Sequence, residues 1–404
     1  IVDGVPLENN PGLTDIGRGA DWGSAINLIN PEDIEDLNIL KGPTAAAKYG
    51  TRGAHGVILI TTKRGNKRKG LGIQYSLTHK VISPYRYREV QNIYGAGGPI
   101  NILDPAFNTN GDGEVVYPAD VHSSNGPFGR PTTEQFGFYS TGMSWGPKME
   151  GQMVRWWDGE LRSFDPQPDN LQQFFSNGST TTHNISFSGG NERSTMRVSM
   201  TAQNHTAVVP NSDFQQYTAN LGGNLEIHKN LIADVAISYI NFNRKNSPSL
   251  GDDNNSSFGK GILYSWPRSY KGLEETLNFN EDGTQYDYNG RYPFTFTPQH
   301  LWWNTWHQNT FLSRNKLIGS LGLAFTPFSW LSITGRTGLD FNLIQLEERF
   351  EPVYATGVNG ARYSNELVRD RVVNNEFLVT AFKDYVFNSP FGVKVSFGGA
   401  QWGR

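Results

Sequence analysis

The sequence contains no cysteine, so it has neither a disulfide framework nor a thiolate metal site. No apolar run approaches the ~18–20 residues of a membrane-spanning helix. This second absence does not exclude a membrane, because the strands of a membrane barrel alternate lipid-facing with lumen-facing residues and keep a low average hydropathy. The net charge is only −3, which argues against a nucleic-acid-binding surface.

Catalytic signatures are also scarce. The pattern G-x-S-x-G occurs at residues 142–146, but it lies among glycines and aromatic residues, whereas a nucleophile elbow joins a strand to a helix. The eight histidines are scattered without an H-E-x-x-H pattern. Adjacent acidic pairs such as Glu347 and Glu348 point to opposite faces of a strand and make poor acid–base partners. We therefore expect no enzyme and no catalytic residue.

Two segments resemble the start of a calcium-binding loop, at residues 108–113 and 278–283. Each lacks the glutamate at the twelfth position that would close such a site, because Ala119 and Asn289 stand there. Hydrogen-bonded Asx turns explain both segments. We expect no cofactor and no metal site, with a calcium ion bound by these loops as the alternative.

Glycine and aromatic residues are abundant instead. Glycine accounts for 45 of 404 residues, where about 7% is usual, and aromatic residues for 13%. After Gly70 the apolar residues recur with period two; Met196, Val198 and Met200, for example, alternate with polar neighbours. The alternating runs near 215–227, 231–242, 310–325 and 331–345 exceed the five or six residues usual for soluble strands.

A soluble β-sandwich would also alternate, so the composition of the polar face must decide between the two folds. That face carries ionisable side chains, namely Arg197, Glu226, Asp234, Arg336 and Asp340. A dry core between two sheets would not accept them unpaired, whereas a wet or plugged lumen would. We predict a mainly β protein with eight to ten antiparallel strands of a transmembrane β-barrel.

Residues 30–63 form a compact unit of a different kind. Asn30 can cap a short helix whose first position is Pro31, with Asp33 near the positive end of the helix dipole. The apolar run at residues 57–60 predicts a strand buried on both faces. A unit this small cannot enclose a core of its own, so another part of the protein must surround it.

These residues resemble the plug domain of SusC/RagA-type TonB-dependent outer-membrane transporters. The matching motifs are DGVP at 3–6, INP-DI at 29–34 and LKGP-AAA-YG-RGA-GVILITTKRG at 40–65, with weaker matches at 144–148 and 170–190. The matching signature residues are Asp3, Gly4, Asn30, Pro31, Asp33, Ile34, Lys41, Gly42, Tyr49, Gly50, Arg52, Gly53, Gly56, Thr62, Lys63 and Gly65.

The resemblance implies a barrel of the 22-stranded class, incomplete in this chain, with an α/β plug domain in its lumen. Residues 1–69 would be the C-terminal part of the plug, and 70–404 the N-terminal portion of the barrel. Long extracellular connections would occupy about 80–181 and 243–308. We expect the chain to be a fragment that lacks the secretion signal and the TonB-contacting segment.

The resemblance further implies import of oligosaccharides or peptides across the Gram-negative outer membrane. The implied partners are TonB, through the missing segment, a SusD-like surface lipoprotein that covers the extracellular face, and outer-membrane lipid. One alternative is a structural or binding subunit of a larger outer-membrane complex that does not transport. Another is a soluble carbohydrate-binding β-protein, which would require the alternating faces to pair into two dry sheets.

Two sets of site residues are expected. Polar and aromatic residues of the plug loop and the long connections are candidates for facing the substrate: Arg18, Asp21, Trp22, Trp145, Trp156 and Trp157. Plug cations and lumen carboxylates are expected to form at least one polar contact between plug and barrel: Lys41, Arg52, Glu226, Asp234 and Asp340.

Overall fold

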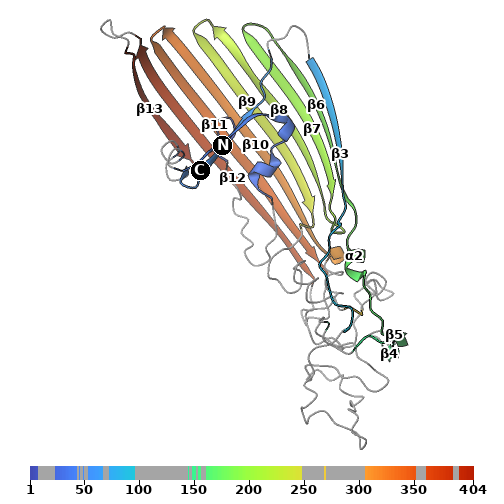
Figure 1. Ribbon diagram of the computed structural model, residues 1–404. Coiled ribbons are helices and arrows are strands. Elements are labelled where there is room, and N and C mark those ends of the chain that lie inside the picture. The colour runs from blue at the N-terminus through green and yellow to red at the C-terminus, as the bar shows by residue number, and fades with distance from the viewer. Residues whose placement is uncertain are drawn as a thin grey trace, which may run out of the picture.

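The computed structural model describes residues 1–7, 23–42, 45, 49, 53–66, 72–95, 144, 148–151, 153–155, 161–247, 268–269, 305–351, 361–384 and 391–404. Most of these residues belong to one antiparallel sheet of nine strands, here called the wall, in the order β13-β12-β11-β10-β9-β8-β7-β6-β3 (Figure 1). Its strands are β3 (Gly72–Ile82), β6 (Gly178–Gly190), β7 (Ser194–Thr206), β8 (Asp213–His228), β9 (Leu231–Lys245), β10 (Gln308–Phe328), β11 (Leu331–Phe350), β12 (Arg362–Lys383) and β13 (Val393–Gly403). The predicted mainly β fold with eight to ten antiparallel strands is confirmed.

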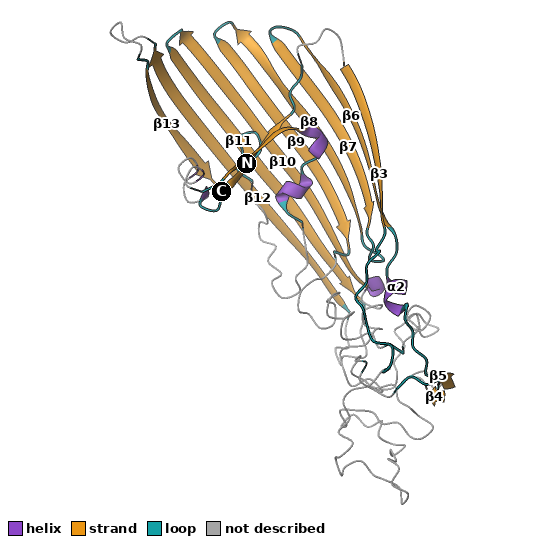
Figure 2. Cartoon of the chain, viewed as in Figure 1, coloured by secondary structure: helices purple, strands orange, loops and turns teal. Residues whose placement is uncertain are grey.

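The described residues between 1 and 66 form a smaller unit, here called the plug segment. It contains the 3₁₀ helices η1 (Ala25–Leu28) and η2 (Pro31–Asp33) and the strands β1 (Ile34–Leu40) and β2 (Val57–Thr62), which pair antiparallel. It lies against one face of the wall, as Figure 2 shows for its purple helices. That face is called the inner face below.

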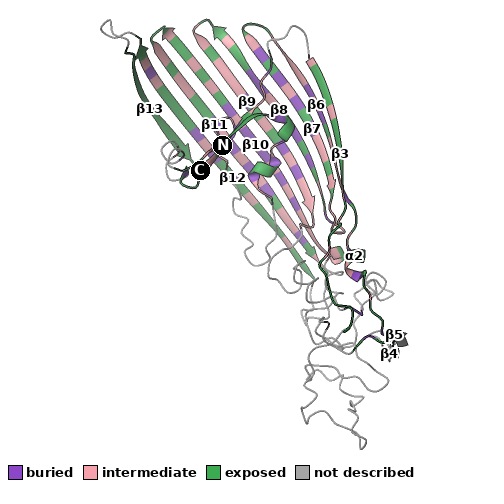
Figure 3. Cartoon of the chain, viewed as in Figure 1, coloured by how far each residue is buried: buried purple, intermediate pink, exposed green. Residues whose placement is uncertain are grey.

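The two faces of the wall differ in composition. Along β7, the inner residues Thr195, Arg197 and Ser199 are buried, whereas Met196 and Met200 are exposed on the outer face. Figure 3 shows this alternation as purple and green bands on neighbouring strands. Exposed large apolar side chains recur on the outer face, including Ile73, Tyr75, Tyr217, Leu225, Ile237, Tyr239, Leu321, Leu323, Phe325, Phe377 and Phe397. The pleat therefore separates a polar inner face from an apolar outer face, as the period of two predicts.

The connections between wall strands differ at the two ends of the sheet. Residues 191–193, 229–230 and 329–330 make short turns at the upper end in Figure 1. At the lower end, β3 ends at Ile82 and β6 begins at Gly178, while β9 ends at Lys245 and β10 begins at Gln308. Three short elements lie beyond this end: β4 (Met153–Arg155), β5 (Leu161–Ser163) and α2 (Asn170–Phe174). We call it the long-connection end.

The plug segment corrects one prediction. β2 is not buried on both faces, because Ile58 is 39% exposed and only Ile60 is fully buried. The strand has β1 on one side and a single parallel bridge from Val2 on the other. Between β1 and β2, residues 43–44, 46–48 and 50–52 lie outside the described residues. Within the described part of the chain, no helix has the length and apolar character needed to cross a membrane.

Candidate functional site: the interface between plug segment and wall

Asp33 is the centre of the contact between plug segment and wall. This last residue of η2 is only 2% exposed. Its Oδ1 accepts hydrogen bonds from Nη1 of Arg197 (2.6 Å) and Oγ of Ser199 (2.6 Å). Its Oδ2 accepts from Nδ2 of Asn220 (2.6 Å) and of Asn30 (3.0 Å). Because a buried carboxylate is costly unless it is paired and fully hydrogen-bonded, these four donors fix where the plug segment can sit.

The local sequence places Asp33 for this contact. The side chain of Asn30 accepts from the backbone N–H of Glu32 (3.1 Å), and Pro31 begins the helix that follows. The backbone N–H of Lys63 donates to the carbonyl of Asp33 (2.8 Å), which ties η2 to the end of β2. Asn30 also donates to Oγ1 of Thr201 on β7 (2.7 Å). The predicted cap is confirmed, and it contacts the wall directly.

An apolar contact lies beside this polar network. Leu28, at the end of η1, packs on Ile240, Phe242, Leu312 and Ile344, all buried on the inner face of β9, β10 and β11. Its carbonyl oxygen accepts from Nε2 of Gln216 (2.9 Å). The inner face is therefore apolar at this point, where Ile240, Phe242, Leu312 and Ile344 surround an apolar plug side chain. Burying one leucine stabilises such a contact by about 1.5–3 kcal/mol.

A second ion-pair network surrounds Arg64. Its guanidinium donates to both carboxylate oxygens of Asp234 on β9 (3.2 and 3.3 Å) and to Oδ1 of Asp3 (3.2 Å). Asp3 also accepts from the backbone N–H and Oγ1 of Thr62 (3.0 and 2.8 Å). Arg64 thus joins the N-terminal turn, the end of β2 and the wall at the point where the chain leaves the plug segment.

The DGVP motif makes the tight turn that carries Asp3. Asp3 and Gly4 both have positive φ (48° and 84°), and Val2 and Val5 exchange backbone hydrogen bonds (2.9 and 2.8 Å). This is the geometry of a type I′ turn, which favours Asp-Gly. Val5 is fully buried against the wall, where a Cβ on Gly338 would lie 2.9 Å from its Cγ2.

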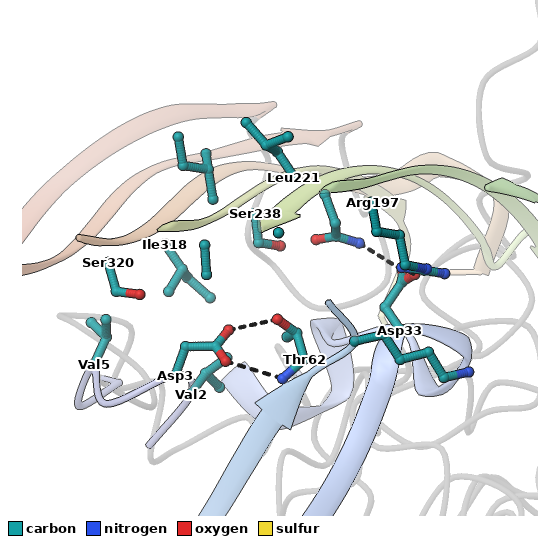
Figure 4. Close-up of a pocket in the computed structure, with 15 residues that line it drawn as sticks. Val2, Asp3, Val5, Asp33, Thr62, Arg197, Leu221, Ser238, Ile318 and Ser320 are labelled. Atoms are coloured by element: carbon teal, nitrogen blue, oxygen red, sulfur yellow. Dashed lines mark hydrogen bonds and ion pairs between the residues drawn. The ribbon is translucent and has the colours of Figure 1, made fainter. Parts of the chain in front are cut away.

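Little empty space remains between plug segment and wall. The cavity in Figure 4 has a volume of about 10 Å³, room for roughly one water molecule, between Val2, Asp3 and Asp33 on one side and Arg197, Ser238 and Ser320 on the other. Leu221 lines the same space but points away from the plug segment. Around this cavity the described residues of plug segment and wall are therefore closely packed.

Only some of the five residues predicted to join plug and barrel form ion pairs in the structure. Asp234 contacts Arg64, and Asp340 pairs with Lys316 of the neighbouring strand, both side chains being fully buried. Within the described part of the chain, Lys41 is exposed without an ion pair and Glu226 has no ion pair either. Arg52 lies outside the described residues. The prediction assumed plug cations and wall carboxylates, but at Asp33 the charges are reversed. There the plug segment supplies the carboxylate and the wall supplies the arginine.

The remaining signature residues are spread along the plug segment. Ile34 begins β1, Lys41 and Gly42 follow it, Tyr49 and Gly53 lie between β1 and β2, Gly56 precedes β2, Thr62 ends it, and Lys63 and Gly65 lead toward β3. Gly42 and Gly56 have positive φ (61° and 99°), which explains glycine at both positions. Gly50, Arg18, Asp21, Trp22, Trp145, Trp156, Trp157 and the calcium-like segments 108–113 and 278–283 lie outside the described residues.

Sequence reasoning missed Arg64, Ser199 and Asn220 as site residues and did not give Arg197 a partner. Arg64 lies in a run of basic residues that reads as a solvated linker, so its pairing with Asp234 had no local signal. The alternation of Arg197 and Ser199 with apolar residues could have placed both on the inner face. Their common partner, Asp33, is more than 160 residues away and cannot be read from spacing.

The inner face is basic and aromatic between the plug contacts and the long-connection end. Cross-strand pairing puts Lys80, His205 and Arg244 on one row, through Thr180 and Phe214. Nδ1 of His205 contacts Oγ1 of Thr180 (2.8 Å), and its ring stacks on Phe214 with centroids 4.6 Å apart. Aromatic faces suit sugar rings or peptide side chains, and the cations suit anionic groups.

Metal chemistry has no support in the described residues, among which no three His, Asp or Glu side chains gather closely enough to hold an ion. The interface instead joins a folded segment to the polar face of a long-stranded antiparallel sheet whose other face is apolar. This combination defines the plugged barrels of outer-membrane receptors.

Comparison with known proteins agrees with that class. The family "TonB-dependent Receptor Plug Domain" matches residues 1–57. The TonB-dependent receptor SusC of Bacteroides thetaiotaomicron is 24% identical over 221 residues, which is 55% of this chain and 16% of SusC. A TonB-dependent receptor of Formosa agariphila is 52% identical over 65 residues, 16% of this chain and 5% of that protein. The chain thus spans a small part of these relatives' length.

Two solved structures share the fold. The RagAB peptide importer in the open-open state superposes with a TM-score of 0.59 at 17% identity, covering 90% of this chain and 38% of that chain. The RagAB peptide transporter superposes with a TM-score of 0.59 at 16% identity, covering 96% and 43%. Residues 1–57 thus match the plug domain of TonB-dependent receptors, and the chain is similar in sequence and fold to receptors of the SusC/RagA type. Members of this family are outer-membrane proteins of Gram-negative bacteria.

Proposed function

We propose that this chain forms the plug-seating part of a receptor that imports oligosaccharides or peptides across the outer membrane. The observation that carries the proposal is the seat of the plug segment: two ion-pair networks and one leucine contact hold it, with room for about one water between it and the wall. Such a seat holds the plug segment on the wall, yet it consists of contacts that can break and reform.

The likeness to SusC and to the RagAB peptide importer supports the two substrate classes. The row of Lys80, His205 and Arg244 beyond the plug contacts supplies aromatic and cationic groups that either substrate could meet. Energy for release would come from TonB, and a SusD-like lipoprotein would cover the long-connection end. The outer face, with its exposed apolar residues, would contact lipid.

The proposal requires the plug segment to leave its seat during transport. In the full-length receptor, Asn30→Cys and Thr201→Cys would place two thiols where the side chains now touch at 2.7 Å. Because these 404 residues contain no native cysteine, the new disulfide is the only one that can form within them. We expect the oxidised receptor to bind labelled oligosaccharide or peptide but not import it, with import restored by a reducing agent.

The matched control is Asn38→Cys with Thr201→Cys, which pairs an exposed β1 position with the same wall residue. Import by the oxidised Asn30/Thr201 variant at the unmodified rate would contradict release of the plug segment. Absence of import by the unmodified receptor would instead favour the alternative, a structural or binding subunit within a larger outer-membrane complex.

A further inference from the structure

In the part of the chain that the structure describes, one buried arginine links the two long connections beyond the wall. Arg268 belongs to the connection between β9 and β10, and it is only 3% exposed. The described residues around it, at 91–95, 144 and 161–175, belong to the connection between β3 and β6. None of these contacts involves the plug segment.

The hydrogen bonds of the Arg268 guanidinium all go to the other connection. Nε and Nη2 donate to Oδ1 of Asn92 (3.1 and 3.0 Å). Nη2 also donates to the carbonyl oxygens of Gln167 and Pro168 (2.8 Å each), and Nη1 donates to Oδ1 of Asn170. A planar five-donor fork can reach all four acceptors on these two segments, residue 92 and residues 167–170, whereas a lysine ammonium with three donors cannot.

The backbone of Arg268 adds two further bonds. Its N–H donates to Oγ of Ser144 (2.9 Å), and its carbonyl oxygen accepts from the N–H of Gln167 (2.7 Å). Gln91 in turn donates to the carbonyl of Ser144 (3.3 Å). Two motifs that the sequence analysis left without a role, at 144–148 and from Asn170 onward, therefore meet at this one residue.

Because the Arg268 guanidinium is buried, it needs hydrogen-bond acceptors to compensate for the loss of water. Burial lowers the pKa of the Arg268 guanidinium, an effect that nearby Asp169 partly offsets, yet arginine stays charged at neutral pH. A buried charge without partners is strongly unfavourable, so the four acceptor groups and the guanidinium stabilise one another. Phe164 and Phe174 are also buried in this region and complete a small core outside the wall.

We infer that Arg268 is a positioning residue that holds the two long connections together as one body at the mouth of the barrel. It fixes α2 and the segment before it relative to residues 91–95 and 144, which sets the shape of the entrance. This role does not depend on the imported substrate, nor on import itself.

The test is hydrogen–deuterium exchange on the purified full-length receptor. We expect Arg268→Gln to speed backbone exchange in residues 161–175 and 91–95 by about tenfold or more, because several charge-assisted hydrogen bonds are lost. Arg268→Lys should give nearly the same increase, since it keeps the charge but loses the fork. Exchange in β7 to β11 should not change, which also verifies that the barrel has folded.

Arg86→Gln is the matched control, since Arg86 is an exposed arginine in the connection between β3 and β6. A second variant tests whether joining the connections is all that Arg268 does. Gln167→Cys with Arg268→Cys places a disulfide where the two backbones are already hydrogen-bonded, a separation compatible with disulfide geometry. The oxidised form should exchange slowly and the reduced form should behave like Arg268→Gln.

Unchanged exchange in Arg268→Gln would overturn the inference, as would rapid exchange in the oxidised double-cysteine form. Because the measurement needs no substrate and no TonB, its failure is distinguishable from failure of the proposed import. Import assays on the same variants then show how much transport depends on the entrance geometry.

Discussion

At the scale of single residues, the interface is held by a few charges whose partners are far away in sequence. Asp33 collects four donors from η2 and two wall strands, and Arg64 joins two carboxylates. Removing one partner of a buried pair leaves the other charge uncompensated, which costs more than the pair itself contributes. These residues therefore control how easily the plug segment leaves its seat.

Arg64→Met should weaken the seat measurably. The Arg64 and Asp234 side chains are 17% and 36% exposed, so solvent screening limits the expected loss to about 1–2 kcal/mol. The readout is the urea concentration at which a single reporter thiol, introduced at buried Ala25, reacts with maleimide in the full-length receptor. Arg193→Met, an exposed arginine in the turn between β6 and β7, is the control. Equal midpoints for both variants would show that Arg64 contributes nothing.

At the scale of elements, the fit between the N-terminal turn and β11 depends on a missing side chain. Gly338 faces Val5 at a point where a Cβ would be too close, whereas Gly319 on β10 has open space around it. A type I′ turn with buried valines on both sides cannot shift without losing the Asp3 contacts.

Gly338→Val should therefore displace the turn and cost about 1–3 kcal/mol through overpacking. The same reporter thiol at Ala25 should react at a lower urea concentration. Gly319→Val adds the same side chain to the neighbouring strand without a contact and should leave the midpoint unchanged. If both valine variants shift alike, the close approach of turn and strand is not what limits the seat.

The elements themselves were largely predictable from the sequence, because strands with period two and glycine-rich turns leave local signals. The helix cap at Asn30 and the turn at Asp3-Gly4 were predictable too, because each depends only on residues close by in the sequence. The interaction partners of the site residues were not predictable. Asp33 and Arg197, for example, meet only when strands far along the chain assemble. The exposed face of β2 was misjudged because an apolar run does not reveal which neighbours will cover it.

At the scale of the molecule, the plug segment is seated on the inner face of a wall whose strands from β6 to β12 are 13 to 22 residues long. Polar groups on the inner face provide the seat, and apolar groups on the outer face suit lipid. The two long connections meet beyond the seat, where Arg268 joins them. Seat and entrance are thus built from separate residues and can be altered independently.

The most direct test of the account is a double-mutant cycle between Asp33 and Arg197. Asp33→Asn, Arg197→Met and the combined variant are compared by the urea midpoint of the Ala25 reporter thiol, with exposed Glu35→Gln as the control. We predict that each single variant loses about 3 kcal/mol and that the combined variant loses far less than the sum. Additive losses, or midpoints equal to that of the unmodified receptor, would contradict a plug segment held on the wall by this ion pair.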